Sequence, residues 1–432
     1  MIDREGRLWV GSGNLTPRGP KTWHITDHDQ RRQFAATYAP LSPNEDDDET
    51  EEICLSQLRK HVDQLGPEFF GIRFSEPDGP ITLLTDRQHD VTLYVNNHPL
   101  SVLDLPFPVK TIYLRNLTEL DRLGPDVDLV SYRGPPSVAA TGCATTTVAF
   151  KYWYMVNGMF RTWYELNCWS RLPRDHSHIV PFDAIVLDHH TDGIVGFTTQ
   201  YIPGGTLKDT NATTRPFRLE WFRQLLSVVD DLNYQYGVMH QVIAPRNLLV
   251  DEKDNLRIFD FNYSAMIGKH YAPERDDVKG VIFTLYEIIT LDEHFREVPH
   301  AEQDAEAVLS MSWEKHPRVR LDADVRAFRD ALDSWVAKRK ARTVFKPADT
   351  WVCWPEMPKF PVIALPTLAG AQNVSAPAVS RRTLVERGKP YFNWERPASY
   401  SLKDALAKKE AAATKRDNLG DALAEEQPSA KK

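Results

Sequence analysis

Cysteine is scarce in this chain of 432 residues, which contains four cysteines and no Cys-x-x-Cys pair. Scarce, scattered cysteines exclude a disulfide scaffold, give no zinc signal and fit a reducing compartment. No window approaches 18 uninterrupted apolar residues, so the sequence predicts no membrane span. The first residues, MIDREGRLWVGSG, have no apolar run of the kind found in signal peptides. We therefore expect a cytoplasmic or nuclear protein.

An excess of positive charge is also missing. The chain has 52 Lys and Arg residues against 60 Asp and Glu residues, a formal net charge of −8. This balance argues against a general nucleic-acid-binding role. The hydrophobic fraction of 42% suffices for a large core, and the length suits one two-lobed domain with extensions.

We expect irregular extensions at both ends of the chain, because prolines are more frequent there than in the middle. Residues 1–52 include the acidic run NEDDDETEE, which is typical of a disordered, solvated segment. Residues 53–125 combine an amphipathic helical pattern over 53–65 with short strand-like runs, and predict a small α+β module. Residues 345–432 predict a Pro-rich and charged tail that is largely disordered.

The stretch over residues 237–262 places two polar side chains at the ends of a predicted hairpin. Asn247 directly precedes the first strand, LLV, and Asp260 follows the second, LRIF. A hairpin brings its two ends together, so we expect these residues to be neighbours in space. Amide and carboxylate oxygens are ligands that Mg²⁺ prefers. The stretch therefore predicts a magnesium site with Asn247 and Asp260 as ligands.

This stretch resembles the protein kinases, whose catalytic loop has the pattern H-R-D-L-x-x-x-N and whose metal loop is D-F-G. Here residues 240–247 are HQVIAPRN and residues 260–262 are DFN. The His, the Asn and the metal Asp have the family's spacing, but Val242 occupies the position of the catalytic Asp. The resemblance implies an α+β, bilobal protein-kinase-like fold over residues 126–344, with a β-rich small lobe to about residue 202 and an α-rich large lobe.

Two upstream motifs extend the resemblance. Residues 148–151, VAFK, resemble the V-A-I-K strand, whose Lys holds the α- and β-phosphates of ATP and pairs with a Glu on the next helix. The resemblance implies that Lys151 and Glu165 form this pair. Residues 194–205, IVGFTTQYIPGG, resemble the last small-lobe strand and the hinge. The implied ATP pocket is then lined by Ala149, Thr199, Gln200, Ile202 and Leu249.

Two other regions depart from the family pattern. The glycine-rich loop that covers the ATP phosphates is expected in RGPPSVAATGCATTT, over residues 133–147, which has two glycines and two prolines that lack amide hydrogens. The phosphate cover is therefore expected to be degenerate. The segment between Asn262 and Asp277 is too short for a normal peptide-docking loop. The resemblance also places Asp277 at the start of a helix beneath the catalytic loop.

The residues that remain favour binding of ATP with Mg²⁺ over phosphoryl transfer. Arg246 can replace the loop Lys of the family, but Val242 cannot accept a proton from a substrate hydroxyl. General-base catalysis contributes roughly 3–5 kcal/mol to lowering the barrier. The sequence therefore predicts a pseudokinase or weakly active kinase that works with a protein partner or protein substrate. Three alternatives stay open: an active serine/threonine-type kinase with another base, a small-molecule phosphotransferase, and a nucleotide-free scaffold.

Overall fold

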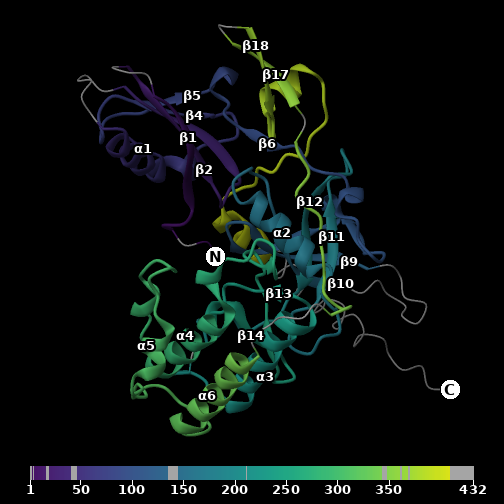
Figure 1. Ribbon diagram of the computed structural model, residues 1–432. Helices are drawn as coiled ribbons and strands as arrows, with labels where there is room; N and C mark the ends of the chain where they lie inside the picture. Colours follow the sequence, from purple (N-terminus) through teal and green to yellow (C-terminus); the bar gives the residue numbers. More distant parts are fainter. Residues whose placement is uncertain are drawn as a thin grey trace, which may run out of the picture.

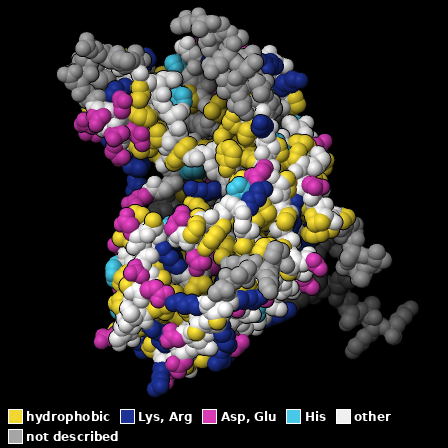
Figure 2. Space-filling model, in the orientation of Figure 1, with side chains coloured by type: hydrophobic (Ala, Val, Ile, Leu, Met, Phe, Trp, Pro, Cys, Tyr) yellow, Lys and Arg dark blue, Asp and Glu magenta, His cyan; other side chains and the backbone are white. Residues whose placement is uncertain are grey.

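The computed structural model describes residues 2, 4–15, 19–39, 46–134, 145–210, 212–342, 348–360, 362–367 and 370–408, with backbone only over 362–375. The fold is mixed α+β, with two larger sheets and a separate helical part (Figure 1). In the part of the chain that is described, no helix is long and apolar enough to cross a membrane. Basic and acidic side chains are interspersed on the face shown in Figure 2, so that face offers no continuous basic surface.

The N-terminal part forms a five-stranded sheet with a helix on one face (Figure 1). Its strands are antiparallel except for the parallel pair β3–β4. Side chains such as Ile25, Phe34 and Ile72 are fully buried, and they pack with Cys54 and Leu58 of the helix. The elements are β1 (Leu8–Leu15), β2 (Lys21–Asp27), β3 (Arg32–Tyr38), α1 (Asp47–His61), β4 (Gly71–Phe74) and β5 (Thr82–Leu84).

The predicted disorder of residues 1–52 is therefore wrong for most of this segment. Trp23 and Ile25 of β2, and Phe34, Ala36 and Tyr38 of β3, lie at every second position and supply one face of the sheet. The acidic run begins α1 and places Asp47, Asp48 and Glu49 in its first turn. Carboxylates there are stabilised by the positive end of the helix dipole, so the run favours a helix start instead of a solvated linker.

A six-stranded sheet with the order β7-β11-β12-β10-β9-β8 forms the second layer. Its elements are β7 (Thr111–Tyr113), β8 (Thr118–Gly124), β9 (Val127–Arg133), β10 (Thr145–Tyr152), α2 (Met159–Trp169), β11 (Phe182–Leu187) and β12 (Ile194–Gln200). The strands β7 and β8 lie before residue 126, where the sequence placed the start of the kinase-like part. The sequence of β8, TELDRLG, is too polar to predict a strand. The strand forms nevertheless, because its buried Arg122 is paired with carboxylates.

The helical part contains one hairpin, β14–β15, and a second pair of short strands, β13–β16, that are distant in sequence (Figure 1). The largest apolar cluster of the described residues runs through this part and continues into α2, β11 and β12. The helix α3 continues as a π-helix over Asp231–Gln235. The elements are α3 (Leu219–Asp230), β13 (Val238–Met239), β14 (Leu248–Val250), β15 (Leu256–Ile258), β16 (Ala265–Met266), α4 (Asp277–Thr290), α5 (Ala305–Ser310) and α6 (Val325–Ala341).

The C-terminal segment packs against earlier parts of the chain, including β10 of the six-stranded sheet. β6 (Leu93–Val95) pairs with β19 (Ala378–Ser380), α7 (Arg381–Glu386) follows, and β17 (Val362–Thr367) pairs with β18 (Gly370–Ser375). Trp394 is buried and stacks on Tyr152 with 5.4 Å between ring centroids. The predicted disorder of residues 345–432 is thus wrong for residues 348–360 and 376–402, because aromatic side chains in this segment bury apolar area. The tail beyond residue 408 lies outside the described residues.

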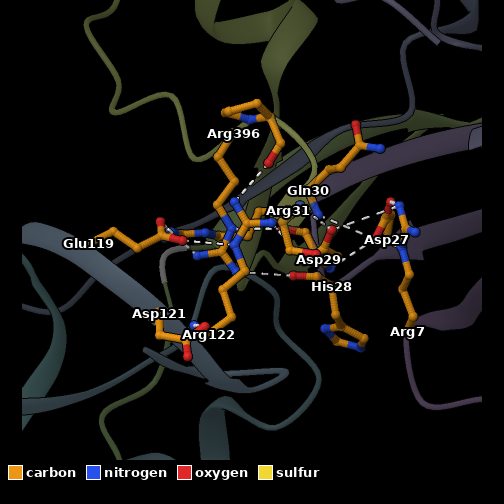
Figure 3. Close-up of polar contacts among 12 residues, drawn as sticks. Arg7, Asp27, His28, Asp29, Gln30, Arg31, Glu119, Asp121, Arg122 and Arg396 are labelled. Carbon is orange, nitrogen blue, oxygen red and sulfur yellow. Dashed lines mark hydrogen bonds and ion pairs between the residues drawn. The ribbon is translucent and has the colours of Figure 1, made fainter. Parts of the chain in front are cut away.

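Buried ion pairs join three distant segments (Figure 3). Arg122 of β8 contacts Asp29, in the turn between β2 and β3, at 2.7 Å, and Glu119 at 2.7 Å. Arg396 of the C-terminal segment contacts Asp128 of β9 at 2.9 Å. Removing one partner of a buried pair leaves an uncompensated charge, which is strongly destabilising. The network therefore fixes the N-terminal sheet and the C-terminal segment against the six-stranded sheet.

Candidate functional site

A cavity of about 550 Å³ lies where the six-stranded sheet faces the helical part. It is lined by residues from β10, α2, β12, the hairpin β14–β15 and the turn between β8 and β9. The structure brings ten of the sequence-predicted site residues to this one cavity, which are Ala149, Lys151, Glu165, Thr199, Gln200, Ile202, Arg246, Asn247, Leu249 and Asp260. Val242 is the predicted residue that does not line it.

Lys151 occupies the centre of the charged end of this cavity. In β10 the alternate residues Val148, Phe150 and Tyr152 are buried, so Lys151 points to the opposite face of the sheet. Its Nζ atom donates a hydrogen bond to Asp260 at 2.6 Å and lies 2.6 Å from a carboxylate oxygen of Glu165. The Lys–Glu pair that the kinase resemblance implies is therefore formed as a contact.

The pKa values at this end of the cavity follow from burial and from Lys151. Burial alone would lower the pKa of Lys151, but Asp260 and Glu165 outweigh it and raise that pKa. Burial raises the pKa of Glu165 to about 8, although Lys151 opposes the rise. Burial would also raise the pKa of Asp260, but Lys151 lowers it below its usual range. The contact with Lys151 therefore outweighs burial at Asp260 but not at Glu165.

The hairpin β14–β15 places Asn247 and Asp260 at its open end. Leu248 pairs with Ile258, and the amide of Phe259 donates to the carbonyl of Asn247 at 3.2 Å. The predicted proximity of the hairpin ends is thus confirmed. The side-chain amide of Asn247 donates to the carbonyl of Val242 at 2.9 Å, which leaves its oxygen as an acceptor. The acceptors available to a divalent cation here are this oxygen and the carboxylate of Asp260.

A buried aspartate anchors the loop that precedes the hairpin. Asp277, the first residue of α4, accepts hydrogen bonds from the backbone amides of His240 at 2.8 Å and Gln241 at 2.7 Å. It also accepts one from the side chain of Asn233 at 2.8 Å. Three hydrogen bonds to one buried carboxylate hold residues 240–247 in a fixed position.

Val242 faces a different depression from the one that holds Lys151. It lines a groove of about 430 Å³ together with Arg246, Lys279 and Arg296. Arg246 lines both the groove and the cavity, so it marks the place where they meet. Val242 is 8% exposed and carries no group that accepts a proton. A carboxylate base at this position is therefore absent.

A turn that the sequence did not predict lines part of the cavity. It comprises residues 123–127, between β8 and β9. Residues 135–144, most of the predicted phosphate-covering loop, lie outside the described residues. The turn between β8 and β9 includes Asp126, which sequence reasoning missed because β8 was not predicted. The signal available was the Gly-Pro-Asp triplet between two strands, which is typical of a tight turn.

A segment of the C-terminal region holds the outer side of α2. Glu356 accepts a hydrogen bond from Tyr164 of α2 at 3.3 Å, forms an ion pair with Lys269 at 2.7 Å and lies 2.8 Å from Nε2 of His270. Phe360 makes an edge contact with Phe160 of α2. These contacts fix the helix that carries Glu165 against the loop after β16.

No family model matches this chain. Part of the chain is similar to plant protein kinases. It is 34% identical over 95 residues to CBL-interacting protein kinase 15 of Oryza sativa subsp. japonica, which is 21% of each chain. It is 35% identical over 94 residues to CBL-interacting serine/threonine-protein kinase 19 of Arabidopsis thaliana, which is 21% of this chain and 19% of the relative.

A third relative, CBL-interacting serine/threonine-protein kinase 2 of Arabidopsis thaliana, is 37% identical over 79 residues. These matches span about a fifth of the relatives' own length. The likeness therefore extends over one part of the chain only. It indicates a kinase-like relationship for that part.

Proposed function

We propose that this chain contains a bilobal protein-kinase-like unit that binds ATP with Mg²⁺ and transfers phosphate weakly or not at all. The six-stranded sheet with α2 would be its small lobe, and the helical part its large lobe. Because β7 and β8 belong to the sheet, the unit would run from about residue 111 to residue 342. The contact that carries this proposal is Lys151 between Glu165 and Asp260, inside the cavity.

The proposed nucleotide position follows from the two ends of the cavity. Ala149, Ile202 and Leu249 supply an apolar lining that suits a purine ring, and backbone groups near Gln200 supply hydrogen-bonding edges. Lys151, Asn247 and Asp260 supply the cation and oxygen ligands that a magnesium triphosphate needs. When bound, Mg²⁺ would neutralise phosphate charge, with Asn247 and Asp260 as its protein ligands.

The weak transfer that we propose rests on Val242. Four described acids line the cavity, and each has another task or position. Glu165 and Asp260 contact Lys151, Asp209 accepts from Thr206 at 2.8 Å, and Asp126 lies in the turn between β8 and β9. None of them lies in the groove that adjoins Arg246, whose own described acids are Glu274, Asp276 and Glu297. Asp276 accepts from the amides of Val278 and Lys279 at the start of α4, and none of the three occupies position 242. A hydroxyl substrate in that groove would meet a valine where a base is needed.

The groove beside Arg246 is the surface that we propose for a protein partner or a protein substrate. Its described lining has mixed charge, with the cations Arg246, Arg275, Lys279 and Arg296 and the acids Glu274, Asp276 and Glu297. Arg296 is paired with Glu287, and Lys279 donates to two backbone carbonyls. The groove joins the nucleotide cavity at Arg246, so a side chain bound in it would approach the phosphate end.

A thermal-unfolding titration tests the nucleotide part of this proposal. We expect ATP with Mg²⁺ to raise the unfolding temperature of the wild-type protein, and ATP with a chelator to raise it less. A ligand present at 100 times its Kd stabilises the folded state by about 2.7 kcal/mol, which is readily detected. Asp260→Asn should lose the Mg²⁺-dependent part of the shift. Absence of any shift with Mg-ATP would contradict the proposal.

A further inference from the structure

The turn between β8 and β9 covers the cavity with a carboxylate. Gly124 pairs with Val127, so Pro125 and Asp126 form the tip of the turn. The backbone carbonyl of Asp126 accepts a hydrogen bond from the amide of Tyr152 at 3.0 Å. One carboxylate oxygen lies 3.9 Å from the place that a Cβ atom would occupy on Gly158, at the start of α2. The turn is therefore fixed against β10 and α2, with Asp126 in the cavity wall.

The carboxylate of Asp126 has no cation of its own among the described residues. The charged groups that face it are Lys151 on β10, Asp128 on β9 and Arg31 in the turn between β2 and β3. Lys151 is in contact with Glu165 and Asp260, and Arg31 is in contact with Glu119 and Asp128. Both nearby cations are therefore already neutralised by other carboxylates. Burial of the unpaired group raises the pKa of Asp126 to about 6.

The described cavity lining as a whole is short of positive charge. Its bases are Lys151 and Arg246, and its acids are Asp126, Glu165, Asp209 and Asp260. The turn at its edge has one backbone amide fewer to offer an anion, because Pro125 has no amide hydrogen. A nucleoside triphosphate carries several negative charges into this space. An uncharged nucleoside brings no charge, and it can use the apolar lining from β10, β14 and the segment after β12 together with the backbone groups near Gln200.

We propose that Asp126 is a selectivity residue of this cavity. It lowers the affinity for the polyphosphate of a nucleotide and leaves the affinity for an uncharged nucleoside unchanged. This inference rests on the proposed nucleotide site, and it adds the class of ligand that the site prefers. A carboxylate in the wall disfavours phosphate through charge repulsion, which is strong where the surroundings are partly buried.

Calorimetric titration with two ligands tests this role. Adenosine and Mg-ATP would each be titrated into the wild-type protein, Asp126→Asn and Asp78→Asn. Asn preserves the size of Asp126 and removes its charge. Asp78 is an exposed residue that pairs with Lys60 on the surface, so Asp78→Asn removes the same charge from outside the cavity.

We expect Asp126→Asn to bind Mg-ATP about tenfold more tightly than the wild-type protein and Asp78→Asn do. Adenosine should bind the three proteins with equal affinity. For the wild-type protein, the affinity for adenosine should be at least as high as the affinity for Mg-ATP. Unchanged Mg-ATP affinity in Asp126→Asn would overturn the inference and leave the nucleotide site standing. Equal tightening of both ligands would also overturn it, because the change would then be structural.

Failure of both ligands to bind any of the three proteins would remove the nucleotide site, and the role of Asp126 with it. Asp126→Ser is the second variant, for use if Asp126→Asn does not fold, since it also removes the charge. Its expected effect on the two ligands is the same in direction.

Discussion

Lys151 of β10 donates a hydrogen bond to Asp260, which follows β15, across a 2.6 Å distance. The two residues are 109 positions apart and belong to different layers, the six-stranded sheet and the helical part. Their contact closes the charged end of the cavity. The charged form of each residue also depends on the other, because burial disfavours ionisation of both and their contact favours it.

Restoring an acid at position 242 should increase phosphoryl transfer. Val242→Asp places a carboxylate where the proposed unit lacks its base, beside Arg246 and the groove. General-base catalysis is worth about 10²–10⁴ in rate, so incorporation of label from radiolabelled ATP should rise clearly above the wild-type level. Val242→Asn is the matched control, because it is polar and of similar size but cannot act as a base. Equal rates in the two variants would mean that more than the base is missing.

The effect of Asp126 on ATP binding should depend on pH. Burial raises the pKa of Asp126 from 3.8 to about 6, so its carboxylate is charged above that pH and neutral below it. The advantage of Asp126→Asn over wild type in Mg-ATP affinity should therefore be full near about pH 8 and shrink towards about pH 5. Calorimetry at several pH values measures this ratio. A ratio that stays constant would exclude titration of Asp126 as its source.

The same group should alter the pH dependence of stability. The folded-state pKa of Asp126 is raised, so the folded protein binds this proton more tightly than the unfolded chain does. Wild type should therefore lose stability relative to Asp126→Asn as the pH rises from about 4 through about 6. Urea unfolding of both proteins across this range measures the difference. A difference that grows in the opposite direction would contradict the burial of this carboxylate.

The C-terminal segment should contribute strongly to stability. Trp394 is buried against Tyr152, and Trp394→Ala should lower the free energy of unfolding by about 3–5 kcal/mol. Tyr400 is 56% exposed, so Tyr400→Ala should change it by less than about 1 kcal/mol. Denaturant unfolding compares the two. Similar small effects would show that residues near 394 do not pack on the six-stranded sheet.

The central site could be predicted because its residues lie in short local patterns. The hairpin between Asn247 and Asp260 is set by its own strands and turn, and the strand around Lys151 is set by alternating apolar residues. Their roles in binding ATP and Mg²⁺ stay predictions. The similarity to plant kinases over part of the chain is in keeping with them.

The elements that escaped prediction depend on distant partners. The sequence of β8 is polar, and its Arg122 can be buried because Asp29 and Glu119 neutralise it. Asp29 lies 93 positions away, so the local sequence does not reveal this pairing. The prolines and charges of the C-terminal segment predict disorder. The segment is ordered because aromatic residues in it, such as Trp394, pack on β10. The position of Asp126 at the tip of a turn depends on the pairing of β8 with β9, and β8 was not predicted.

Calorimetric titration of Mg-ATP into wild type and Lys151→Met tests the nucleotide site most directly. The methionine keeps much of the side-chain volume and removes the cation that contacts Glu165 and Asp260. Lys60→Met, at a surface ion pair, is the control for charge alone. We expect wild type and Lys60→Met to bind Mg-ATP with similar affinity, and Lys151→Met to bind it at least about tenfold more weakly. Equal binding by all three proteins, or no binding by wild type, would contradict a nucleotide site at Lys151.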